Sequence, residues 1–299
     1  MNSKLTGLIA APHTPFHEDG SLNLDIIPKQ AAWLARNRVS GAFICGTTGE
    51  WISLTTAERL SIAEKWLAFA PPGLKVIVHA GHNSLEDAKA IAAHAQLSGA
   101  YALAAMAPDY FRPATLPVLV DLCAAIAGTA PGLPFYYYHM PSMNGVHFAV
   151  TDFLKAASPR IPNLAGVKYT YENLMDYRQC VALENGRFNA LFGRDEIMLA
   201  ALAMGAEGFV GSTYNFIAPV YHDVIAAFQK RSLKAAQQHQ TLAIEVIAAL
   251  SRHGGMAAGK AVMKMLGIDC GPMRLPLTTV TDEQFKTLQG ELQRLHILP

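Results

Sequence analysis

Short apolar segments alternate with longer segments of helical periodicity along most of this chain. Strands that are apolar throughout and separated by helices predict a parallel sheet covered by helices, and eight such repeats can close the sheet into a barrel. We therefore predict an α/β fold, a (β/α)8 TIM barrel. The eight expected strands are Leu5–Ala11, Ala42–Cys45, Lys75–His79, Tyr101–Ala105, Leu133–Tyr138, Leu164–Lys168, Ala190–Phe192 and Gly208–Gly211.

The helical segments continue beyond the eighth repeat, which predicts a C-terminal helical extension. The expected division is a barrel over 1–230 and an extension over 231–299. An open doubly wound sheet is the alternative, but no strand is followed by G-x-G-x-x-G and no G-x-x-x-x-G-K-[ST] occurs. The expected helices are Ile26–Asn37, Ala57–Ala68, Leu85–Leu97, Pro117–Ala127, Leu174–Leu183, Glu196–Met204 and Pro219–Lys230, then Leu233–Ser251, Ala257–Leu266 and Thr281–His296.

Charge and cysteine content narrow the class of partner. The 24 basic and 23 acidic side chains give a formal charge of +1, which supplies no long-range field for nucleic acid or an anionic membrane. A small-molecule partner fits better. Four widely spaced cysteines without a C-x-x-C pair indicate reduced thiols, and the first residues show no secretory leader pattern. No apolar stretch approaches the roughly 20 residues of a spanning helix. We expect a cytoplasmic protein.

Chemistry in such barrels occurs at the carboxyl ends of the strands. Lys168 ends the apolar run Leu164–Lys168, so a long cationic side chain is placed at the lip of a strand. Desolvation lowers a lysine pKa towards that of a neutral amine, which can attack a ketone. A lysine that extends out of the barrel mouth into solvent is the alternative, and this residue alone does not decide between them.

The segment Gly46-Thr47-Thr48-Gly49-Glu50 follows the second strand and brackets two hydroxyls with glycines. Neutral hydroxyl and amide donors of this kind can hold a carboxylate. The alternative is a turn in which Thr47 and Thr48 only cap the backbone.

Three further strand ends carry polar side chains. Tyr138 ends an aromatic run, and strand alternation directs its phenol to the barrel mouth, where it could relay protons or simply pack. Asp195 and Glu196 follow the seventh strand without a nearby basic run, and they could bind a polyol or favour a helix start. Ser212 and Thr213 after the eighth strand allow the same two interpretations, ligand binding or capping.

Metal chemistry is the remaining possibility, because His13, His79, His82 and His139 lie near strand ends. No His-x-His or H-E-x-x-H pattern occurs. We interpret these histidines as hydrogen-bonded structural groups and expect no metal site.

The motifs at the strand ends, in their order and spacing, resemble the superfamily of N-acetylneuraminate lyases and dihydrodipicolinate synthases. They are Gly46–Glu50, Tyr138-His139-Met140-Pro141 and Gly166-Val167-Lys168-Tyr169-Thr170. The resemblance covers nearly the whole chain, from Thr14-Pro15-Phe16 to Gly271–Leu277. Within the superfamily, Gly193-Arg194-Asp195-Glu196 and Gly211-Ser212-Thr213-Tyr214-Asn215 resemble the lyases more closely.

The resemblance implies a Schiff-base class I aldolase that cleaves N-acetylneuraminate to pyruvate and N-acetylmannosamine without a metal or organic cofactor. It also implies a homotetramer. In the roles it implies, Lys168 forms the imine, Tyr138 relays protons, Thr47 and Thr48 hold the carboxylate, Gly193, Asp195, Glu196 and Ser212 meet the polyol, and Thr170 lines the same cleft.

Two alternatives stay open at this point. One is a related aldolase or hydratase-aldolase for another 2-keto acid, such as a 2-keto-3-deoxygluconate aldolase or a dihydrodipicolinate synthase-like enzyme. Those synthases usually carry an arginine where this chain has Met143, and a tyrosine donated across a subunit interface near Tyr110. The other alternative is a non-catalytic sugar-acid sensor, which would leave Lys168 and Tyr138 unexplained.

Overall fold

The computed structural model describes residues 4–298. Eight parallel strands close into a barrel in sequence order. All eight predicted strands are confirmed, and each boundary lies within two residues of the prediction. The strands are β1 Gly7–Ala10, β2 Gly41–Ile44, β3 Lys75–His79, β4 Ala102–Met106, β5 Phe135–His139, β6 Leu164–Tyr169, β7 Asn189–Phe192 and β8 Gly208–Gly211.

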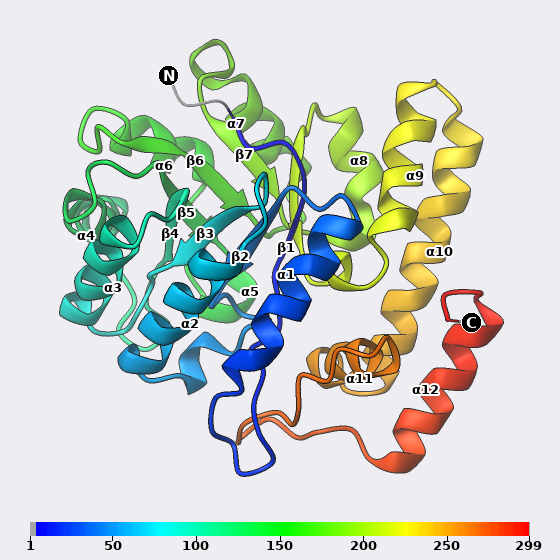
Figure 1. The fold of residues 1–299 in the computed structure, drawn as a ribbon. Coiled ribbons are helices and arrows are strands. Elements are labelled where there is room, and N and C mark those ends of the chain that lie inside the picture. The colour runs from blue at the N-terminus through cyan, green and yellow to red at the C-terminus, as the bar shows by residue number, and fades with distance from the viewer. Residues whose placement is uncertain (1–3, 299) are drawn as a thin grey trace.

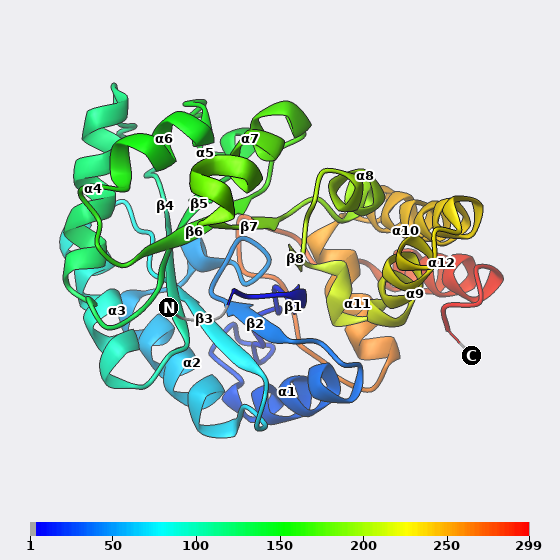
Figure 2. The same ribbon diagram turned by 90° about the horizontal axis from the view of Figure 1, so that it is seen from above.

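The barrel closes where β1 pairs with β8. The pairing runs from Gly7 opposite Gly208 to Ala10 opposite Gly211. The barrel strands are buried almost throughout, in agreement with their apolar sequences, because helices cover the outside and side chains fill the inside. Figure 2 shows this arrangement from above, with the helices placed around the strands.

The predicted helices around the barrel are confirmed with small shifts of boundary. Two helices were not predicted, α5 Pro141–Asn144 and α6 Val150–Ala157. The segment predicted as one helix over Glu196–Met204 begins with a 3-10 turn at Asp195–Ile197. The helix α7 has non-helical backbone at Leu183–Asn185, which is where the helix predicted over Leu174–Leu183 ends. The helices are α1 Ile27–Arg36, α2 Thr56–Phe69, α3 Leu85–Leu97, α4 Leu116–Gly128, α5 Pro141–Asn144, α6 Val150–Ala157, α7 Leu174–Gly186, α8 Met198–Ala203 and α9 Ala218–Gln229.

The three helices predicted for the C-terminal part are present as α10 Leu233–Arg252, α11 Met256–Met265 and α12 Asp282–Arg294. The helix α10 packs beside α8 and α9, and α11 and α12 pack against α10 and against each other, with α11 below the barrel in the view of Figure 1. Between α11 and α12 the chain returns to the barrel. There the Arg274 guanidinium binds the Glu58 carboxylate and the Gly20 carbonyl oxygen.

Two predictions concern the ends and the membrane. Residues 1–3, on which the expected absence of a leader partly depends, lie outside the described residues. Within residues 4–298, no helix is long and apolar enough to cross a membrane.

Candidate active site

Lys168 lies inside the barrel. It sits on β6, and strand alternation turns its side chain inward while Tyr169 faces the surrounding helices. The side chain is 4 % exposed. Its Nζ lies 4.0 Å from the ring centroid of Phe43 and 3.8 Å from that of Tyr138. Of the two predicted placements, the structure shows the enclosed one, and the alternative of a lysine extended into solvent is wrong.

The enclosure changes the acidity of the amine. Burial lowers the pKa of Lys168 from its ordinary value, while Tyr138 and Asp195 favour the charged form and oppose the shift. A lowered pKa increases the fraction of neutral amine, which is the nucleophilic form. The strand end that carries Lys168 can therefore support attack on a carbonyl carbon.

The end of β6 is fixed by Asp176 of α7. This buried carboxylate accepts hydrogen bonds from the Tyr169 hydroxyl at 3.1 Å and from the backbone N–H groups of Val150 and Thr151 at 3.0 and 3.1 Å. The Thr151 hydroxyl adds a bond of 2.8 Å. Because α6, α7 and β6 meet at one carboxylate, the residue next to Lys168 has little freedom to move.

A pair of hydroxyls lies beside the lysine. The Tyr138 hydroxyl is 3.1 Å from the Thr47 Oγ1, within hydrogen-bonding distance, and also lies 3.0 Å from the Met140 sulfur. Phe43 contacts the Tyr138 ring edge to face, with centroids 5.4 Å apart. The two hydroxyls can exchange a proton with each other, a connection that the sequence motifs did not reveal.

The Gly46–Glu50 turn is anchored by a buried ion pair. Glu50, the last residue of the turn, has a positive φ of 56° and lies 2.8 Å from the Lys260 Nζ of α11. Its other carboxylate oxygen accepts the backbone N–H of Arg274 at 3.0 Å. The C-terminal helices therefore fix the turn that carries Thr47 and Thr48.

Thr170 and Gly193 adjoin each other at the ends of β6 and β7. A Cβ at Gly193 would lie 2.2 Å from the Thr170 Oγ1, so the position requires glycine if Thr170 keeps its place. The Thr170 hydroxyl is buried and has no hydrogen-bond partner among residues 4–298. It is free to bind a ligand.

Asp195 is held against β8. Its Oδ2 accepts the backbone N–H of Thr213 at 3.1 Å and the Thr213 hydroxyl at 2.5 Å. Gly211 makes room for it, because a Cβ there would lie 1.8 Å from the Asp195 Oδ1. Burial raises the pKa of this carboxyl, and the bonds from Thr213 oppose the shift.

Asp195, Glu196 and Ser212 line one cavity of about 220 Å³, which we call the His13 cavity. Glu196 also pairs with the neighbouring Arg194 at 3.4 Å. The other lining residues are His13, Thr213, Phe216, Ile247, Leu250, Ser251, Gly255, Met256 and Gly259.

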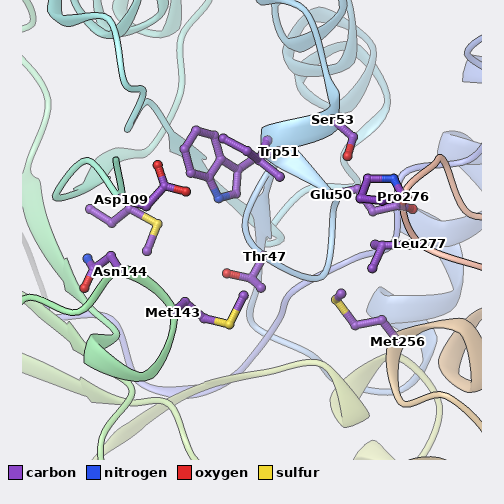
Figure 3. Close-up of a pocket in the computed structure, with 12 residues that line it drawn as sticks. Thr47, Glu50, Trp51, Ser53, Asp109, Met143, Asn144, Met256, Pro276 and Leu277 are labelled. Carbon is purple, nitrogen blue, oxygen red and sulfur yellow. The ribbon is translucent and has the colours of Figure 1, made fainter. Parts of the chain in front are cut away.

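A second cavity, of about 160 Å³, opens beside Thr47 (Figure 3). We call it the Trp51 cavity. Its walls are mostly apolar, and they include Trp51, Met143 and Met256, which also lines the His13 cavity. The two cavities thus lie on either side of Met256 at the barrel mouth.

The chain matches the model of the dihydrodipicolinate synthetase family over residues 4–295. The protein belongs to this family. N-acetylneuraminate lyase from Mus musculus is 37% identical over 99% of this chain and 94% of its own, and that from Gallus gallus is 38% identical over 98% and 96%. The solved N-acetylneuraminate lyase of Aliivibrio salmonicida superposes with a TM-score of 0.97 at 41% identity, covering 100% of this chain and 99% of its own.

The structure places the predicted residues of this family member in two groups. The enclosed centre consists of Lys168, Tyr138 and Thr47. Beside it, Thr170 and Gly193 touch each other at the ends of β6 and β7. Asp195, Glu196 and Ser212 line the His13 cavity, and Thr48 is buried in the turn after β2.

Two expectations about other residues need comment. Both ring nitrogens of His13 are buried without a hydrogen-bond partner among the described residues, so its interpretation as a hydrogen-bonded structural group is wrong. The sequence placed His13 near a strand end but gave no sign that its ring lacks a partner. Tyr110 is 79% exposed and packs edge to face against Phe111. Between residues 4 and 298, no group of three or more His, Cys, Asp or Glu side chains is arranged to hold a metal ion.

Proposed function

We propose that the protein is a Schiff-base class I aldolase that cleaves N-acetylneuraminate to pyruvate and N-acetylmannosamine. The observation that carries this proposal is the enclosed Lys168 amine, with its lowered pKa, beside the Tyr138 and Thr47 hydroxyls. The similarity of the whole chain to N-acetylneuraminate lyases supports the choice of substrate.

The first step joins substrate and enzyme. The neutral Lys168 amine attacks the C2 ketone of open-chain N-acetylneuraminate to give a carbinolamine. Tyr138 gives its phenolic proton to the carbinolamine hydroxyl, which leaves as water, so a protonated imine and a Tyr138 phenolate remain. Thr47 and Thr48 hydrogen-bond the neighbouring carboxylate without adding a cation that would compete with the imine. The imine accepts electrons in the next step, so the cleavage requires no metal or organic cofactor.

The second step breaks the C3–C4 bond. The Tyr138 phenolate left by the first step, in contact with Thr47, takes the proton of the C4 hydroxyl, and the C3–C4 electrons move into the imine. N-acetylmannosamine leaves and an enamine remains on Lys168. Protonation of C3 and hydrolysis then release pyruvate and restore the amine.

The remaining residues orient the sugar. Asp195, Glu196 and Ser212 share a cavity and present oxygens to the hydroxyls of the polyol. Thr170 directly follows β6, and its buried hydroxyl has no hydrogen-bond partner among residues 4–298, so we assign it to the same cleft. Gly193 leaves the space that Thr170 occupies.

Borohydride reduction in the presence of pyruvate tests the first step. We expect the intact mass to increase by one reduced pyruvyl group, and peptide mapping to place it on Lys168. Lys168→Ala should abolish the adduct, whereas Lys155→Ala, at an exposed lysine of α6, should leave it unchanged. Absence of the adduct in the wild type, or its persistence in Lys168→Ala, contradicts the proposal.

Three further properties belong to the same proposal. We expect a cytoplasmic homotetramer, and the exposed aromatic pair Tyr110 and Phe111 supports a subunit contact at that loop. Light scattering after size exclusion measures the assembly. We also propose that residues 1–230 form the barrel unit and residues 231–299 the extension.

A further inference from the structure

His13 is a buried side chain without a partner. It follows β1 and is 2 % exposed, and neither ring nitrogen has a hydrogen-bond partner among residues 4–298. A neutral imidazole carries one N–H donor and one nitrogen acceptor, and leaving both unpaired in a buried position is unfavourable. Buried polar groups of this kind call for a ligand or another explanation.

His13 lines the same cavity as the polar residues of the proposed site, Asp195, Glu196 and Ser212. Gly259 of α11 lines this cavity too, and a Cβ there would lie 2.8 Å from the His13 ring atoms Cε1 and Nε2. Glycine at position 259 of α11 therefore leaves room for the His13 ring, which a larger residue at that position would displace.

The chemistry of the cavity defines what His13 can bind. Asp195 and Glu196, when ionised, can only accept hydrogen bonds. A ligand hydroxyl that donates to one of these carboxylates can therefore still accept a hydrogen bond at its own oxygen from another group. Burial, with a smaller contribution from the charge of Lys260, lowers the pKa of His13 to about 3, so the ring is neutral at physiological pH. A neutral ring can donate to a hydroxyl or accept from it.

We infer that His13 hydrogen-bonds a hydroxyl on the last two carbons of the polyol tail and thereby selects long sugar substrates. The inference rests on the proposed function, because it concerns the substrate of that site. Lys168 and Tyr138 perform the chemistry, and His13 contributes only to binding of the tail. A leucine of similar size would keep the packing but lose both polar atoms.

The test compares two aldehydes in the condensation with pyruvate. N-acetylmannosamine carries the full tail, whereas erythrose lacks the two terminal carbons and also the acetamido group. Mannose, which has the full tail without the acetamido group, separates the two differences and should respond as N-acetylmannosamine does. For His13→Leu we expect kcat/KM to fall about 10-fold or more with N-acetylmannosamine, mainly through KM, and to stay unchanged with erythrose. His17→Leu, at an exposed histidine of the following loop, serves as the matched control and should change neither.

Stability and imine trapping separate the possible outcomes. His13→Leu removes an unpartnered buried polar ring, so its Tm should equal or exceed that of the wild type, and it should trap pyruvate normally. Equal losses with both aldehydes, no loss with either, or a lowered Tm would overturn the inference and leave the aldolase proposal intact. Failure of the wild type to trap pyruvate would overturn both.

Discussion

Replacing Gly211 by alanine tests how Asp195 is held. Gly211 has no positive φ, so its backbone conformation accepts alanine, but the new Cβ would lie 1.8 Å from the Oδ1, 2.3 Å from the Cγ and 2.4 Å from the Oδ2 of Asp195. Contacts of this type are normally 3.4–4 Å. The carboxylate must therefore move by well over an ångström, away from Thr213.

The expected loss follows from the bonds that the movement breaks. The Thr213 N–H and hydroxyl both donate to a charged oxygen, and each such bond contributes about 1.5–3 kcal/mol. Losing both destabilises the fold by about 3 kcal/mol or more. If the polyol depends on the same carboxylate position, kcat/KM for N-acetylneuraminate falls about 100-fold, at roughly 1.4 kcal/mol for each factor of ten.

Urea denaturation and a coupled pyruvate assay measure the two effects of Gly211→Ala. Gly128→Ala is the matched control, because a Cβ at this end of α4 meets nothing within 4 Å, and alanine there should stabilise the helix slightly. Pyruvate trapping on Lys168 should survive in both variants, since the lysine lies on β6. Wild-type stability and kcat/KM in Gly211→Ala would refute the assigned contact between β8 and Asp195.

Two further predictions concern the buried cations. Lys260→Met leaves the Glu50 charge buried without its partner and should destabilise the fold by about 3–5 kcal/mol, measured by urea denaturation. The double variant Lys260→Met/Glu50→Gln should lose less stability, because no charge is then left unpaired. Equal losses in the single and double variants would contradict this. Lys168 has a lowered folded pKa, so between that pKa and the ordinary value near 10.4 the unfolded chain binds more protons and stability should rise with pH. Lys168→Met should lack this part of the rise in stability. If the urea midpoints of the wild type and Lys168→Met change with pH in parallel, the predicted contribution of Lys168 is wrong.

The barrel could be predicted from sequence because its strands are apolar throughout and recur with helices between them. The fifth repeat shows the limit. The helix α6 is short, and its start is fixed by hydrogen bonds from Val150 and Thr151 to the Asp176 carboxylate of α7, which no local pattern encodes. By contrast, the helix predicted over Leu174–Leu183 ends where the backbone becomes non-helical, at Leu183–Asn185.

Strand ends could be inspected one at a time in the sequence, which is why Lys168, Tyr138 and the Thr47 turn were found. Relations between strand ends were out of reach. The distance between the Tyr138 and Thr47 hydroxyls depends on the register of the barrel, and the isolation of the His13 nitrogens depends on every residue packed around them. A single sequence carries no pattern for either.

The ion pair between Glu50 and Lys260 has a consequence for the order of assembly during synthesis. Glu50 is made early with β2, whereas Lys260 emerges only after all eight strands have left the ribosome. Until then the acidic side chain has no lysine to neutralise it, so it favours hydration over burial. We therefore expect the loop after β2 to stay open to water until α11 has been made.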